Sequence, residues 1–149
     1  MAARRTNGAA PHASLKTHFQ VFYVVSFGYG PRDPFRYAIY VETTQHQQGI
    51  ILQAQALSRG VLSYSTATFP NPNDSIHTVC LQPIGWAAKN SISQIKGICQ
   101  RIPMGAPDDN REGPPLPGQP PRDKEEWANV AIDALFAHGL FLPLGRLDA

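Results

Sequence analysis

The sequence predicts an α+β fold in which a five-stranded, mostly antiparallel sheet is packed by two helices. Between residues 19 and 83, short runs of alternating residues are separated by Gly, Pro, Asn and Asp, which is typical of a β-meander. After residue 90, apolar residues recur three and four positions apart, as on one face of a helix. The length of 149 residues fits one domain.

Five segments carry the strand pattern. Residues 19–26 are apolar on both faces, which indicates a central strand. Residues 35–42 follow the turn "GYGPRDP" and place Arg36 and Tyr40 on one face. The other three strands are predicted at 50–57, 60–66 and 76–83, with Pro83 closing the last one.

Two helices are predicted after the strands. Asn90 is a suitable N-cap for the first helix, and Pro103 stops it. Asp123 and Glu126 form a capping box for the second helix, and Gly139 ends it. The apolar stripe of the first comprises Ile92, Ile95, Cys99 and Ile102. That of the second comprises Trp127, Val130, Ala131, Ala134 and Leu135.

The composition along the chain predicts where the domain lies. Residues 1–16 lack periodicity and are predicted to be a flexible tail. Residues 17–142 form the single domain, and 143–149 form a second tail. Within the domain, residues 103–121 hold seven prolines in nineteen positions, which predicts an extended loop. A lid, a linker and a plain surface loop all remain open for it.

Charge and cysteine content exclude several classes of function. A net charge of +2, with scattered basic residues, does not suit nucleic-acid binding. The longest apolar run, "VFYVV", is far shorter than the ~20 residues that cross a bilayer, so no membrane span is predicted. Two distant cysteines and a start without an apolar leader predict a reduced, cytoplasmic setting.

Metal and nucleophile chemistry also find little support. No cluster of His, Cys and carboxylate residues has the spacing of a metal site, and no glycine-rich phosphate loop exists. We therefore predict no metal and no cofactor. Cys80 and Cys99 are both interpreted as small core residues, and His138 as a helix-end residue that complements the helix dipole.

The order of these elements, together with "FRYAIYV", "ISQIKGICQRIPM" and "AIDALFAHG", resembles a group of small uncharacterised fungal proteins with a reduced papain-like Cys/His fold. The resemblance covers roughly residues 18–140. It matches the histidine position of that family to Arg36 and places its cysteine near Trp127. Arginine stays protonated and tryptophan has no nucleophile, so the resemblance implies a scaffold that has lost its catalytic pair.

Such a scaffold favours a small-molecule pocket. Arg36 is the candidate catalytic group, because it can polarise a carbonyl of the ligand. The candidate ligand-binding residues are Tyr37, Tyr40, Gln53, Gln55, Tyr64 and Trp127. The expected partner is an apolar small molecule, bound or converted by a cofactor-independent cyclisation or isomerisation, as in fungal secondary metabolism.

Two other interpretations stay open. The aromatic residues can equally be core, and Gln53 and Gln55 the solvent face of a strand. Alternatively, the protein is a non-enzymatic pseudo-peptidase that binds partners through the proline-rich loop, where Pro114 and Pro117 have the spacing that adaptor domains recognise.

Overall fold

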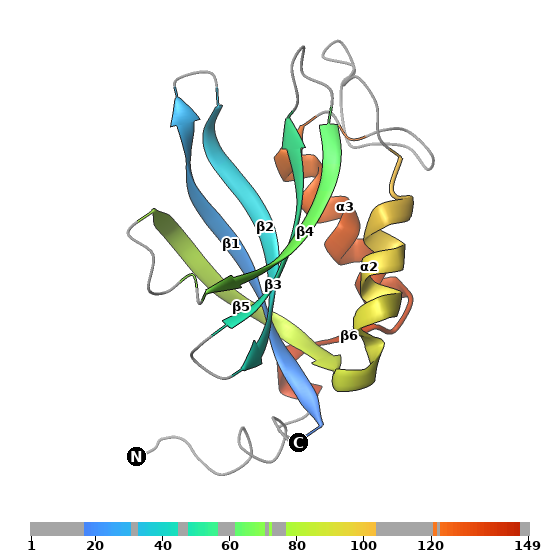
Figure 1. The fold of residues 1–149 in the computed structure, drawn as a ribbon. Coiled ribbons are helices and arrows are strands. Elements are labelled where there is room, and N and C mark those ends of the chain that lie inside the picture. The colour runs from blue at the N-terminus through green and yellow to red at the C-terminus, as the bar shows by residue number, and fades with distance from the viewer. Residues whose placement is uncertain are drawn as a thin grey trace, which may run out of the picture.

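A computed structural model describes residues 17–30, 33–44, 48–56, 62–70, 72, 77–103, 121 and 123–146. It confirms the α+β class, with one antiparallel sheet in the order β4-β3-β2-β1-β5-β6 and two α-helices (Figure 1). The strands are β1 His18–Gly30, β2 Asp33–Thr44, β3 Gln48–Ala56, β4 Leu62–Pro70, β5 Thr78–Ala88 and β6 Phe141–Leu142; the α-helices are α2 Ile92–Arg101 and α3 Lys124–Ala137. The sheet therefore has one strand more than predicted.

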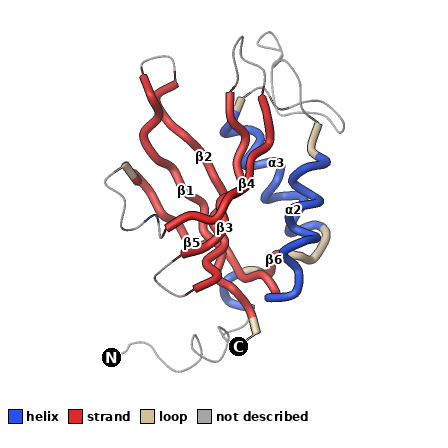
Figure 2. Tube along the Cα trace, in the orientation of Figure 1, coloured by secondary structure: helices blue, strands red, loops and turns tan. Residues whose placement is uncertain are grey.

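The two helices lie together on one side of the sheet (Figure 2). Trp127, Ala131 and Leu135 of α3 are fully buried, and they pack on residues of β1, β2 and β3. The sheet residues of this core include Val21, Ile39, Val41, Leu52 and Ala54. Burial of these side chains holds the helices to the sheet.

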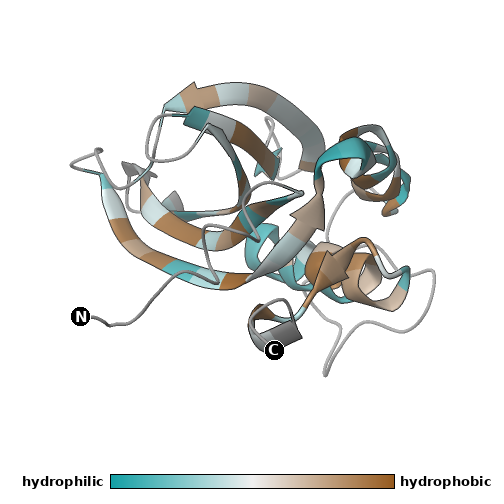
Figure 3. Ribbon diagram, turned by 90° about the horizontal axis from the view of Figure 1, so that it is seen from below, coloured by the Kyte–Doolittle hydropathy of each residue, from teal (hydrophilic) through white to brown (hydrophobic). Residues whose placement is uncertain are grey.

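The opposite face of the sheet is also apolar. Val24, Ala38, Tyr40 and Ile51 form a second buried cluster there, joined by Phe22 and Leu81. The sheet curls like half a barrel, so this face is concave and the strands shield it themselves (Figure 3). β1 is therefore apolar on both faces because one face packs in the helix-side core and the other packs in the concave cluster.

The helix ends largely follow local sequence rules. The backbone N–H of Glu126 donates to Asp123 Oδ1 at 2.8 Å, which confirms the predicted cap of α3. Gly139 has a φ of 73°, as expected for a residue that ends a helix. Asn90 does not cap α2, however. It lies in the 3-10 turn η3 Lys89–Ser91, and α2 begins after Ser91.

Pro83 does not close its strand, contrary to the prediction. β5 continues through it to Ala88, and the register with β1 shifts beside the Phe22–Pro83 pair. Among the described residues, β5 meets β6 on its other side only at Trp86 and Ala87. Pro83 therefore occupies an edge of the described sheet beside a bulge, a position at which a strand tolerates proline.

The chain beyond residue 142 is held to the sheet for a further stretch. Leu144–Arg146 form the 3-10 turn η4, and the indole nitrogen of Trp86 donates to the carbonyl of Leu144 at 3.0 Å. This turn overlaps the predicted second tail, 143–149, of which residues 147–149 lie outside the described residues. The predicted first tail, 1–16, and most of the proline-rich loop, 104–120, lie outside the described residues. None of the described helices is long and apolar enough to cross a membrane.

Candidate functional site

The sheet separates the predicted site residues into two groups. Alternation along β2 sends Arg36 and Tyr40 to the concave face and Tyr37 to the helix face. Gln53 and Gln55 on β3 follow the concave face. Tyr64 of β4 and Trp127 of α3 belong to the helix-side core. The structure therefore brings Arg36 and Gln53 together but keeps Trp127 apart from them.

The aromatic residues of the helix face pack against one another. Trp127 is 0% exposed and lies against Tyr64, with ring centroids 5.9 Å apart. Tyr37 stacks on Tyr23 at 6.4 Å. Burial raises the pKa of Tyr64 to about 12 and also raises the pKa of Tyr37. Trp127 and Tyr64 thus stabilise the core, which is the interpretation that the sequence left open for them.

Tyr40 and Gln55 lie near the concave pocket without lining it. Tyr40 is fully buried in the second cluster, where its ring is tilted against Phe22 with centroids 6.1 Å apart. Gln55 lies two residues along β3 from Gln53 and is exposed. Of the predicted residues, only Arg36 and Gln53 line the pocket described next.

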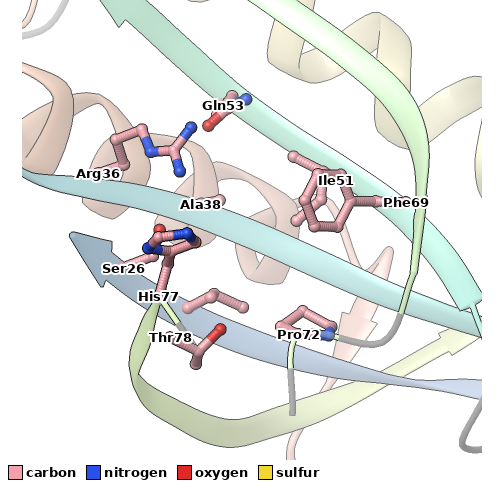
Figure 4. Close-up of a pocket in the computed structure, with 10 residues that line it drawn as sticks. Ser26, Arg36, Ala38, Ile51, Gln53, Phe69, Pro72, His77 and Thr78 are labelled. Atoms are coloured by element: carbon pink, nitrogen blue, oxygen red, sulfur yellow. The ribbon is translucent and has the colours of Figure 1, made fainter. Parts of the chain in front are cut away.

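The concave face holds a pocket with a volume of about 50 Å³ (Figure 4). One wall is apolar and is formed by Val24, Ala38, Ile51, Phe69 and Pro72. Phe69 is 42% exposed and stands at the mouth, whereas Pro72 is buried. By this measure a water needs ~10–15 Å³, so the pocket holds a few waters or one small polar group.

The other wall of the pocket is polar. It is formed by Ser26, Arg36, Gln53, His77 and Thr78. The side chains of Arg36 and Gln53 extend toward one another, and the imidazole of His77 lies on the other side of the guanidinium (Figure 4). None of the described lining residues is a carboxylate, so the permanent charge of this wall is positive.

Strand pairing explains why these polar residues meet. Ser26 is the register partner of Arg36 on β2 and of Thr78 on β5, so the three side chains follow one another across the sheet. The carbonyl of His77 accepts the backbone N–H of Phe27 at 2.9 Å, which fixes the start of β5 beside β1. Backbone contacts thereby position His77 beside Arg36.

The sequence interpretation missed Ser26, His77 and Thr78. Ser26 could have been found, because a hairpin centred on "GYGPRDP" pairs it with Arg36. Nothing local identifies His77 or Thr78, since they depend on pairing between β1 and the distant β5.

The two cysteines differ, although both were predicted to be core residues. Cys99 is buried, and burial raises the pKa of its thiol to about 12. Cys80 is exposed, so the prediction is wrong for Cys80. Within the described part of the chain, no three His, Cys, Asp or Glu residues converge as a metal site would require.

Comparison with known proteins gives a family match. The model of a family of unknown function, DUF6540, matches residues 22–142. No curated protein and no solved structure matches the chain.

Proposed function

Because the chain belongs to DUF6540, a family of unknown function, we propose its function from the pocket geometry: it binds a small, mainly apolar molecule whose carbonyl or carboxylate group enters the concave pocket beside Arg36. The observation that carries this proposal is the division of the pocket into two walls. A fixed cation, an amide, an imidazole and two hydroxyls face a hydrocarbon wall. Small-molecule sites typically combine apolar lining with a few convergent polar groups.

The size of the pocket sets how such a ligand lies. Sites that enclose a drug-sized molecule measure roughly 300–1,000 Å³, whereas this pocket measures about 50 Å³. It therefore takes only the polar end of the ligand. The apolar body extends over the mouth, where Phe69 and His77 are exposed.

We further propose that this arrangement supports a cofactor-independent isomerisation of a β,γ-unsaturated carbonyl compound. His77 accepts a proton from the carbon next to the carbonyl, and the C–H electron pair becomes a C=C bond. The carbonyl π pair moves to the oxygen, where Arg36 and the Gln53 amide stabilise the negative charge. The His77 imidazolium then returns the proton to the γ-carbon, while the electron pair on the oxygen re-forms the carbonyl and the C=C bond moves to the α,β position, so no oxidant or cofactor is consumed.

A binding experiment tests the first step. A panel of cyclic and branched carboxylates and enones is titrated into labelled protein while amide chemical shifts are followed. Arg36→Met keeps the aliphatic length and removes the donors, so affinity is expected to fall about 10- to 100-fold, the loss of one charge-assisted hydrogen bond. Arg101→Met, on the exposed end of α2, is the matched control and is expected to bind as the wild type. If Arg36→Met and Arg101→Met bind the ligands with equal affinity, the proposal that the pocket binds them is refuted.

The catalytic step has its own test. The His77→Asn variant is expected to bind the same ligands as the wild type. It should no longer catalyse the exchange of their α-hydrogens for deuterium in D₂O. If the wild type binds enones and exchanges no hydrogens, the protein is a binding protein and the isomerase proposal fails.

The papain-like origin remains a hypothesis that rests on sequence resemblance. A catalytic Cys/His pair needs two side chains that face each other. The matched residues do not, because Arg36 lies on the concave side of the sheet and Trp127, on α3, lies on the other side. The alternative of an interaction module using the proline-rich loop concerns Pro114 and Pro117, which lie outside the described residues.

A further inference from the structure

A second aromatic surface lies on the helix face of the β1–β2 hairpin, away from the pocket. It consists of Tyr23, Phe27, Phe35 and Tyr37, and we call it the aromatic strip. Phe27 and Phe35 stack with centroids 6.1 Å apart although they are 53% and 37% exposed. Tyr23 and Tyr37 stack behind them at 6.4 Å. Exposed stacked aromatic rings of this kind commonly mark interaction sites.

Acidic residues stand beside the tyrosine end of the strip. Asp123 and Glu125 are exposed at the first turn of α3. Burial is the largest cause that raises the pKa of Tyr23 and of Tyr37. The negative charge of Glu125 is the second cause at both tyrosines, and the charge of Asp123 is a smaller one. The carboxylates are therefore close enough to the strip to act on a ligand that lies on it.

The β5 residues next to the strip add no positive charge. Cys80 and Gln82 are the register partners of Val25 and Tyr23 on the β5 side, and neither is basic. Lys124 separates the two acidic residues in the sequence, but it is buried. Among the described residues, the strip therefore combines exposed aromatic rings with a negative end.

We propose that the aromatic strip is a docking surface for a proline-rich peptide that carries an arginine or lysine. Prolines in the polyproline II conformation pack on aromatic rings and lose little conformational entropy on binding. The basic residue of the peptide pairs with Asp123 and Glu125. This inference is independent of the pocket and of the proposed isomerisation.

The dimensions of the strip suit such a peptide. Phe27 follows Tyr23 by four residues of β1, which is ~13 Å along a strand. A polyproline II helix advances ~3.1 Å per residue, so about four of its residues cover this distance. One proline packs near the phenylalanine pair and another near the tyrosine pair, and the basic residue then reaches the start of α3.

Charge also argues against two other partners for this surface, an anionic membrane and a second copy of the chain. An anionic membrane is repelled by Asp123 and Glu125. A second copy of the chain, related by a two-fold axis, brings only the aromatic rings and acidic residues of its own strip, so Asp123 and Glu125 gain no cation. A basic proline-rich peptide supplies that cation.

The test uses a fluorescein-labelled peptide of Pro-Pro-Leu-Pro units with one arginine, titrated into the full chain and followed by fluorescence anisotropy. The double variant Phe27→Ser, Phe35→Ser is expected to bind at least about tenfold more weakly, as for loss of a hot-spot aromatic pair. Phe69→Ser is the matched control, because Phe69 is a comparably exposed phenylalanine on the concave face, and it is expected to bind the peptide as the wild type. Thermal melts verify that each variant is folded.

A charge exchange makes the test specific. Glu125→Lys is expected to weaken the arginine peptide and to strengthen a peptide in which glutamate replaces the arginine, and the wild type shows the opposite preference. Absence of peptide binding to the wild type, or equal binding by the double variant, overturns the proposal. So does a dimer in sedimentation that the double variant abolishes, or binding to phosphatidylserine vesicles in place of the peptide.

Discussion

Two glycine substitutions test the close packing of β3 against β2. Gly49 is buried at the start of β3, and a Cβ there would overlap the backbone carbonyl oxygen of Val41 and lie 2.8 Å from the Tyr40 ring. Neither neighbour can move easily, because Val41 belongs to the central ladder and Tyr40 is fully buried. At Gly97 on α2, the nearest atom to a Cβ is Arg101 Nη2 at 3.3 Å, the end of a flexible side chain.

The same chemical change should therefore have opposite effects at the two positions. Gly49→Ala overpacks a rigid site, which typically costs about 1–3 kcal/mol and occasionally more. Gly97→Ala replaces a helix-interior glycine, which typically stabilises by roughly 0.5–1 kcal/mol. In a chain of this size, each kcal/mol shifts the Tm by about 2–4 °C. We expect Gly49→Ala to melt roughly 2–12 °C lower and Gly97→Ala about 1–4 °C higher than the wild type.

Calorimetry or thermal unfolding followed by circular dichroism measures both shifts in one buffer. Each variant serves as the control for the other, since both add one methyl group and remove the same backbone freedom. A Gly49→Ala protein as stable as the wild type would show that β2 and β3 do not approach as closely as described. A destabilised Gly97→Ala protein would refute the reasoning for α2.

Two further predictions concern titratable groups. Burial raises the pKa of Tyr23 and of Tyr64 to about 12, from 10.0, with Glu125 adding to the shift at Tyr23. The unfolded chain therefore loses these protons first, so the contribution of the two tyrosines to stability should be constant below about pH 10 and fall between pH 10 and about 12. The buried Cys99 thiol, whose pKa rises from 9.0 to about 12, adds a fall that begins near pH 9. In urea unfolding at several pH values, Tyr64→Phe should make the tyrosine-dependent fall less steep, and an unchanged slope would contradict the shift. In native protein, an aromatic disulfide reagent should modify the exposed Cys80 quickly and Cys99 only after denaturation; equal rates would contradict the burial of Cys99.

Local patterns in the sequence were sufficient to predict several features of the fold and site. Alternation along one strand predicts that Arg36 and Tyr40 share a face, and the concave side of β2 carries both. The cap at Asp123 and the helix end at Gly139 depend on neighbouring residues alone, and both are observed.

Features that depend on distant pairing could not be predicted in this way. Alternation does not say which face the helices cover, so Trp127 was assigned to the same site as Arg36 although the sheet lies between them. Pro83 was interpreted as a strand end because a proline breaks a two-sided ladder, but among the described residues β5 pairs only with β1 at that point. Cys80 is exposed for a similar reason of tertiary context, because a strand pattern does not say whether anything covers the face on which a side chain lies.

The strand order has a consequence for how the chain folds. β2, β3 and β4 each pair with the preceding strand, so the β1–β4 meander closes through local contacts. β1 receives its second neighbour only from β5, after four strands have been synthesised. Until then, β1 exposes an unpaired edge, and its side chains are apolar on both faces, a combination that favours association between chains. Pairing of β1 with β5 has the largest sequence separation of the ladders between long strands, so we expect it to limit the folding rate. Changes that slow this pairing should therefore lower the yield of native protein even where they leave its final stability unchanged.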